Sequence, residues 1–214
     1  TLTVGGSPPP EVSITVIVTA SNEADTIEPA LQSLLALEYR PLEIIVVNDR
    51  STDDTGAIID RLVTGAEHAQ SLHVEHLPEG WLGKVHAMHR ATEIAAGDWV
   101  LFTDADVVFH PGVIRDAVAQ AEADKLDHFS LLPRMLNGPF LLDITVACFA
   151  QVVTHLAFGL GAIPFGAGAF NMVRRSALEA SEGLSWLKME VADDTGLAFL
   201  IANNGGKSHA VTAL

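Results

Sequence analysis

Apolar residues along this chain gather in short continuous runs, each separated from the next by a segment with helical spacing. Residues 13–20 (SITVIVTA) and 42–49 (LEIIVVND) are β-branched or apolar almost throughout, which is typical of strands buried on both faces. Residues 98–106 (DWVLFTDAD) follow the same pattern, and residues 72–77 (LHVEHL) follow it more weakly. The pattern therefore predicts four strands in the first half of the chain.

Segments with helical spacing follow each of these strands. Between Ile27 and Leu35 apolar side chains recur at helical spacing, and Ser21 or Asn22 can cap the helix that they predict. Further helices are predicted over residues 51–63, capped by Ser51 or Thr52, over residues 83–96, closed by Gly97, and over residues 111–124. This alternation predicts an α/β fold, a single Rossmann-like domain in which helices flank a mostly parallel sheet.

The second half of the chain has a less regular pattern. Short strands are indicated within residues 128–136 and 169–178. Residues 190–206 (EVADDTGLAFLIANNGG) predict a helix with Asp193 and Asp194 in its first turn. No internal repeat or interdomain linker is evident, so we expect these elements to belong to the same domain.

Three polar clusters each end a predicted strand: residues 19–24 (TASNEA), 47–55 (VNDRSTDDT) and 103–106 (TDAD). In open α/β sheets, ligands bind at the carboxyl ends of the strands. Because these ends share one edge of the sheet, the three clusters predict a binding site there.

Asp104 and Asp106 interrupt an apolar run with one small residue between them. In a strand they would project to the same face, where two like charges need a compensating partner. A divalent cation is the simplest candidate, and Mg²⁺ or Mn²⁺ is commonly held by one or two carboxylates plus substrate phosphates. Two aspartates in a loop are often only turn residues, but their position at the end of a buried strand favours a metal site.

Other polar residues each allow two interpretations. Asp49, at a strand end, can accept hydrogen bonds from a nucleoside base or sugar. Glu23 can accept from a ribose hydroxyl or only face a helix N-terminus, and Lys84 can contact a phosphate or nucleoside or only be solvated. Asp193 and Asp194 can supply a general base, or only negative charge at the start of a helix.

Composition narrows the class of partner. The chain has 214 residues, with 12 Lys and Arg against 27 Asp and Glu, a formal net charge of −15. Such an excess argues against nucleic acid as a partner, and it is compatible with cations that mediate contact with an anionic ligand. The single cysteine, Cys148, excludes an internal disulfide.

Two segments bear on location. Residues 1–12 lack the basic start and apolar run of a signal peptide, so we expect a flexible leader and a cytoplasmic protein. The apolar stretch at residues 140–170 fits a buried helix followed by a loop. It also fits a surface that makes peripheral contact with the inner face of the membrane or with a lipid-like acceptor. Polar residues interrupt it, so no run is long enough to predict a membrane span.

Several segments, in order, resemble the family 2 glycosyltransferases of GT-A fold, from about Ser13 to about Gly206. They are VIVTASNEADTIEPALQSLL, IIVVNDRSTDDT, TDADVVFHP, GAFNMVRRSAL and VADDTGLAFLIANNGG. Two more, LPEGWLGKVHAMHRA and LDHFSLLPR, are similar to a narrower branch that includes hopanoid-associated and carotenoid-pathway glycosyltransferases. The resemblance implies a GT-A domain over residues 13–214, which in relatives of this branch continues into a hydrophobic tail.

The resemblance also implies roles for individual residues. The nucleotide-sugar, usually a UDP-sugar, would contact Ala20, Asn22, Glu23, Asp49, Ser51, Lys84, Asp104 and Ala105. Asp106, with Asp104, would bind the Mg²⁺ or Mn²⁺ that bridges the diphosphate. The acceptor side would include Gly168, Phe170, Asn171 and Asp193, and Asp194 would be the catalytic base. Asp193 stands where glutamate is commoner in the family, which leaves the base itself in place.

The implied activity is that of an inverting hexosyltransferase acting on an acceptor hydroxyl, for which the apolar stretch favours a lipid. The Gln-x-x-Arg-Trp motif of processive members is absent from the sequence, so polymer synthesis is not expected. One alternative is a nucleotidyltransferase, which would normally have a basic Gly-rich loop where this chain has the acidic TASNEAD. Another is a non-catalytic nucleotide-sugar-binding domain, which would need no carboxylate at Asp194.

Overall fold

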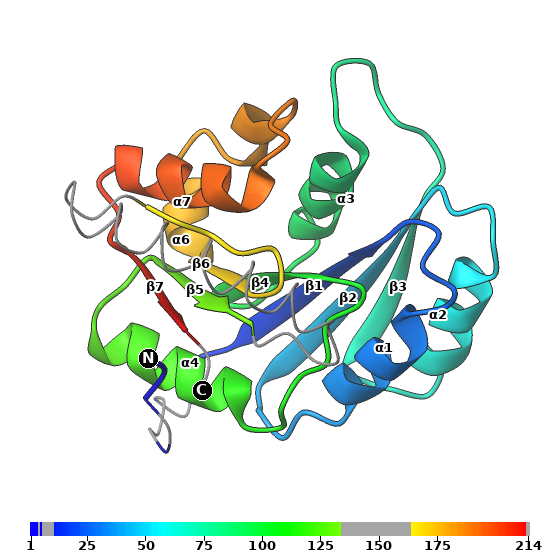
Figure 1. The fold of residues 1–214 in the computed structure, drawn as a ribbon, viewed down its shortest axis with the longest axis horizontal. Helices are drawn as coiled ribbons and strands as arrows, with labels where there is room; N and C mark the ends of the chain where they lie inside the picture. The colour runs from blue at the N-terminus through cyan, green and yellow to red at the C-terminus, as the bar shows by residue number, and fades with distance from the viewer. Residues whose placement is uncertain (4, 6–10, 134–163, 213–214) are drawn as a thin grey trace, which may run out of the picture.

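The computed structural model describes residues 1–3, 5, 11–133 and 164–212, and it confirms the predicted α/β fold. The strands are β1 (Ile14–Ala20), β2 (Leu42–Asp49), β3 (Ala69–Val74), β4 (Trp99–Asp104), β5 (His128–Leu132), β6 (Asn171–Arg174) and β7 (Ser208–Thr212). Within the described residues they form one seven-stranded sheet in the order β3-β2-β1-β4-β6-β5-β7 (Figure 1). β6 runs antiparallel to β4 and β5, and the other neighbours are parallel.

Helices cover both faces of this sheet (Figure 1). They are α1 (Ile27–Leu35), α2 (Thr55–Val63), α3 (Gly83–Thr92), α4 (Val113–Ala123), α6 (Arg175–Glu179), the 3₁₀ helix η1 (Leu184–Leu187) and α7 (Asp193–Asn203). Side chains alternate along β1, so Val16 and Val18 belong to the core with α1, α2 and α4, and Ile17 to the core with α3 and α7. Apolar residues on both faces explain why the strand sequences are almost continuously apolar.

The first two helices begin later than the sequence predicts. α1 begins at Ile27 and α2 at Thr55, so neither starts directly after the expected cap. The polar side chains instead join the two preceding loops: the Asn22 Oδ1 accepts from the Thr52 N–H at 2.8 Å, and the Ser51 Oγ accepts from the Asn22 N–H at 3.0 Å. The expected caps were wrong because contacts between loops compete with capping for the same side chains.

Other boundaries also differ from the sequence-based expectation. β3 begins at Ala69, α3 ends at Thr92, and β4 ends at Asp104, so Asp106 lies beyond the strand. Strand β7 was not predicted, because it is short and half polar, and among the described strands it pairs with β5 alone. Its position depends on a contact between distant segments, which periodicity does not report.

The two segments that bear on location are only partly described. Leu2 is buried against the core, and its N–H donates to the Thr212 carbonyl at 3.2 Å. The flexible leader expected over residues 1–12 stays a prediction, since several of its residues fall outside the described ones. Most of the apolar stretch 140–170 also lies outside them. In the part of the chain that is described, no helix is both long and apolar enough to cross a membrane.

Candidate active site

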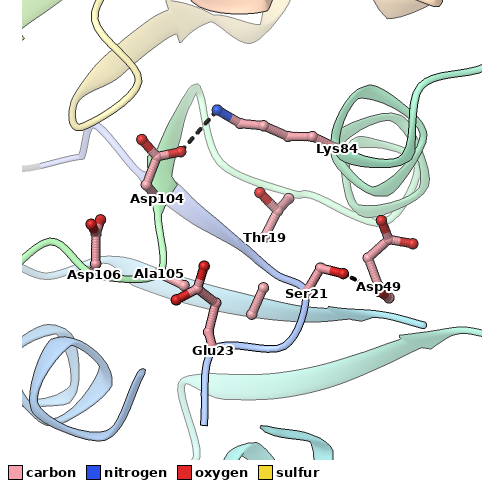
Figure 2. A pocket seen from close by; sticks show the side chains of 9 residues that line it. Thr19, Ser21, Glu23, Asp49, Lys84, Asp104, Ala105 and Asp106 are labelled. Carbon is pink, nitrogen blue, oxygen red and sulfur yellow. Dashed lines mark hydrogen bonds and ion pairs between the residues drawn. The ribbon is translucent and has the colours of Figure 1, made fainter. Parts of the chain in front are cut away.

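A cavity of about 280 Å³ opens at the carboxyl edge of the sheet, where β1, β2 and β4 end (Figure 2). Its lining residues are Thr19, Ala20, Ser21, Glu23, Asp49, Lys84, Asp104, Ala105 and Asp106. Seven of these nine were predicted individually, and Thr19 and Ser21 fall within the polar cluster 19–24 that the sequence placed at the site. Thr19 faces the cavity because it pairs with Asp104 across β1 and β4, and a hydroxyl at the end of an apolar strand was the available signal.

Asp104 and Asp106 reach the cavity from different backbone settings. Asp104 is the last residue of β4, whereas Asp106 stands in the turn that follows. The two carboxylates nevertheless point to the same side of the cavity (Figure 2). The expectation that alternation within one strand aligns them was wrong, and the turn achieves the same result.

Asp49 is held firmly at the end of β2. Its side chain is 5% exposed, and it accepts two hydrogen bonds from Arg50, at 2.8 and 3.0 Å. Hydrogen bonding to Asp49 raises the pKa of Arg50, so the guanidinium stays charged. A Cβ on Gly83 would lie 2.6 Å from the Asp49 Oδ2 and closer still to the Arg50 guanidinium, so a side chain here would have to displace this ion pair. No pattern in the sequence indicated Arg50 or Gly83, because their roles arise from this packing.

Lys84 connects the carboxyl edge of the sheet, where the cavity opens, to helix α7. Its Nζ lies 2.8 Å from the Asp104 Oδ1 and 3.4 Å from the Asp193 Oδ2. Burial alone would lower the pKa of Lys84, but the two carboxylates together outweigh it and the pKa is raised. Burial, with the neighbouring Asp194, raises the pKa of Asp193, while Lys84 opposes that rise. The lysine is thus a charged link between three elements.

Asp194 has a fixed orientation beside the cavity, although it does not line it. Its Oδ2 accepts from the Gly168 N–H at 3.1 Å, and its Oδ1 from the Thr195 N–H at 2.7 Å. Its backbone carbonyl accepts from the Asn171 side chain at 3.0 Å, and a Cβ on Gly166 would collide with that carbonyl. A Cβ on Gly168 would lie 2.7 Å from the Asp104 Oδ2, so the segment passes closely between the two aspartates.

Two residues expected on the acceptor side are inside the protein. Phe170 packs in the core, with its ring 6.0 Å from that of Phe109. Asn171 is buried and contacts the His128 Nε2 at 2.5 Å as well as the start of α7. Gly168 is half-buried, and Asp193 is mostly buried but ion-paired with Lys84, so both stay candidates for acceptor contact while Phe170 and Asn171 support them. Likewise Asn22 and Ser51 lie outside the cavity lining and join its loops.

The carboxylates at the cavity are compatible with a hard divalent cation as their ligand. Within the described residues, no group of three or more His, Cys, Asp or Glu side chains is arranged to hold a metal. Asp104 and Asp106 would therefore supply two carboxylates at most, and phosphate and water oxygens would complete the coordination. This partial set suits Mg²⁺ and Mn²⁺, which retain water and bind through substrate phosphates.

The acidic cavity lies at the carboxyl ends of the strands, where open α/β sheets bind their ligands, and α7 begins beside it with Asp193 and Asp194. The particular family follows from comparison with known sequences. Residues 15–181 match the model of Glycosyl transferase family 2, and the chain belongs to this family. The narrower hopanoid- and carotenoid-associated branch stays a prediction.

Curated relatives are longer than this chain. A poly-β-1,6-N-acetyl-D-glucosamine synthase of Staphylococcus aureus is 29% identical over 170 residues, which are 77% of this chain and 40% of that protein. The glycosyltransferase YibD of Escherichia coli, described as uncharacterized, is 31% identical over 114 residues, 53% of this chain and 32% of that protein. The chain therefore spans less than half the length of either.

Solved structures share the fold. The mannosyltransferase PcManGT from Pyrobaculum calidifontis, in complex with GDP-Man and Mn²⁺, has a TM-score of 0.75 and 26% identity, covering 98% of this chain and 57% of that one. S. aureus TarS 1-349 in complex with UDP-GlcNAc has a TM-score of 0.66 and 19% identity, covering 95% and 59%. At the latter identity the likeness establishes the fold alone.

Proposed function

We propose that this chain is the catalytic domain of a metal-dependent, inverting glycosyltransferase that moves a sugar from a nucleotide-sugar to an acceptor hydroxyl. The observation that carries the proposal is the cavity in which Asp104 and Asp106 share one side, with Asp194 oriented just beyond it. Family membership supports the activity, and PcManGT with GDP-Man and Mn²⁺ supports both the donor class and the metal.

Donor binding follows from the lining of the cavity. Asp49 would accept hydrogen bonds from the base and Glu23 from the ribose, and Asp104 and Asp106 are the residues that would hold Mg²⁺ or Mn²⁺. When bound, the cation offsets the negative charge that develops on the departing diphosphate. An acidic chain can then bind an anionic donor without a basic Gly-rich loop. The acidic loop after β1, where a nucleotidyltransferase would have that basic loop, disfavours the nucleotidyltransferase alternative.

Transfer is a single displacement. The acceptor oxygen attacks the anomeric carbon as the bond from that carbon to the diphosphate oxygen breaks, and the bonding electrons leave with the diphosphate. Asp194 takes the proton of the acceptor hydroxyl. Among the described lining residues, the Ser21 hydroxyl donates to the Asp49 carbonyl at 2.9 Å, so it is not activated as a nucleophile. One displacement inverts the configuration at the anomeric carbon.

The first donor to test is a UDP-sugar, and the first acceptor a lipid alcohol. The resemblance to family 2 favours a UDP-sugar, and PcManGT in complex with GDP-Man makes a GDP-sugar the second donor to test. Apolar residues 140–170 of the sequence, and the exposed Trp186, Met189 and Val191 just before α7, support an apolar acceptor. A lipid acceptor would place the reaction at the inner face of the membrane.

The test is release of nucleoside diphosphate from a panel of UDP- and GDP-sugars, with lipid and water-soluble acceptors, in Mn²⁺ and in EDTA. We expect release with one nucleotide class, only with a divalent cation, and an inverted product by NMR. Equal release in EDTA would remove the metal from the proposal. Binding of a nucleotide-sugar without transfer to any acceptor would favour the non-catalytic alternative.

A further inference from the structure

Lys84 is the sole cation among the nine described residues that line the cavity, where it faces four carboxylates. We propose that its ammonium group is an internal counter-ion. It pairs with Asp104 before ligands arrive, and it exchanges this partner for the diphosphate when the donor binds. Metal and nucleotide would then bind cooperatively, because the nucleotide releases the carboxylate that the metal needs. This inference rests on the proposed function and deepens it.

The geometry gives Lys84 two carboxylate partners from two different elements. It stands in the first turn of α3 and reaches Asp104 at the end of β4 at 2.8 Å (Figure 2). It also reaches Asp193 at the start of α7 at 3.4 Å. The side chains of Lys84 and Asp104 are 38% and 41% exposed, so their contact is open to water and to ligands. The side chain of Asp193 is only 13% exposed, so Asp193 is the more permanent partner.

The electrostatics make this contact exchangeable. A divalent cation on Asp104 and the Lys84 ammonium carry like charges, so sharing one carboxylate is unfavourable for both. A diphosphate offers the ammonium a stronger anionic partner at the same cavity. A lysine suits the exchange because its compact charge sits on a flexible stem with three rotatable donors, unlike the fixed fork of an arginine.

A purely structural role predicts the opposite result. If Lys84 only pinned α7 to β4, neutralising it would loosen the site and weaken Mn²⁺ and nucleotide together. If it is a counter-ion that competes with the metal, neutralising it strengthens the binding of Mn²⁺ alone and weakens the binding of nucleotide. The sign of the change in Mn²⁺ affinity therefore separates the two roles.

The experiment measures binding of Mn²⁺ and of UDP by calorimetry, each alone and in the presence of the other, with free Mn²⁺ checked by EPR. Lys84→Gln is compared with Lys188→Gln, which removes the same charge from an exposed residue between η1 and α7. We expect wild type to show coupling between Mn²⁺ and UDP of about tenfold or more. Lys84→Gln should bind Mn²⁺ alone several times more tightly, bind UDP less tightly and lose most of the coupling. Lys188→Gln should match wild type.

Other outcomes overturn the inference at defined points. Unchanged or weaker Mn²⁺ binding by a folded Lys84→Gln, with wild type binding both ligands, removes the counter-ion role and leaves the proposed function intact. If wild type fails to bind Mn²⁺ together with either UDP or GDP, the proposed function fails and the inference fails with it. Lys84→Arg tests the exchange separately. Because this variant keeps the positive charge, it should bind Mn²⁺ alone no more tightly than wild type.

Discussion

Asp106 stands exposed in the turn after β4, so its side chain can be changed with little effect on the core. Asp106→Asn keeps the shape of the side chain and removes the charge that a cation needs. We expect turnover in Mn²⁺ to fall about a hundredfold or more, since metal stabilisation of the leaving group is lost. Turnover and Mn²⁺ binding are measured together, with the melting temperature as a check on folding. Normal turnover in the folded variant would argue against the metal role.

Asp194 is separate from the donor cavity but oriented by two backbone N–H groups. Asp194→Asn should therefore leave nucleotide affinity within about twofold of wild type while reducing transfer about a hundredfold or more, because the amide cannot accept the acceptor proton. Calorimetry with UDP and a transfer assay on the same preparation test this pair of effects. Transfer at the wild-type rate would exclude Asp194 as the base.

At the scale of elements, the segment from Gly166 to Gly168 passes between β4 and α7. A methyl group on Gly168 would meet the Asp104 carboxylate at 2.7 Å, so Gly168→Ala must displace that carboxylate or the segment itself. We expect kcat/KM to fall about a hundredfold, since small displacements of reacting groups are costly. Gly112→Ala is the matched control, because its added Cβ would lie 2.9 Å from the flexible end of Arg115 and in ordinary contact, at 3.8 Å, with the His110 ring. Equal activity of both variants would contradict this account.

His128 joins three strands in the interior. Its ring contacts the Ser208 Oγ at 2.8 Å and the Asn171 side chain at 2.5 Å, and burial lowers its pKa to about 4. Protonation is therefore easier in the unfolded chain, whose histidines titrate near 6.5, and the stability that depends on neutral His128 is lost as pH falls from about 6.5 towards 4. Burial also lowers the pKa of His86, which adds a change of the same sign.

This linkage is measurable by urea unfolding. Between pH 7 and pH 5, the free energy of unfolding should decrease by about 2 kcal/mol through His128. His128→Gln, which keeps a side chain that can hydrogen-bond, should be less stable at pH 7 but should show a smaller decrease between the two pH values. An equal decrease in both proteins would show that other groups carry the pH dependence.

At the scale of the whole molecule, a net charge of −15 opposes the approach of any diphosphate. Removing divalent cations should therefore weaken UDP binding about a hundredfold, and added Mn²⁺ should restore it. Calorimetric titration of UDP in EDTA, in Mn²⁺ and at two salt concentrations tests this expectation. Tight UDP binding in EDTA would show that the protein's own cations suffice.

Part of the candidate site could be predicted from local pattern. Strands buried on both faces are continuously apolar, so the polar residues that end them are conspicuous, as with Asp49 and Asp104. Helix starts were predicted less well, because Asn22 and Ser51 bond across two loops instead of capping their own helices. β7 could not be predicted, since a short half-polar strand is specified by its partner.

The sequence alone determined the alternation of strands and helices and the gathering of carboxylates at one edge. The periodicity of each segment and the succession of elements along the chain are local or nearly local properties. Only the tertiary structure decided that Lys84 lies between Asp104 and Asp193, and that Gly168 passes between Asp104 and Asp194. These contacts join α3, β4 and α7 across long stretches of chain. They depend on how helices pack on a face of the sheet, and no spacing within a segment encodes that distance.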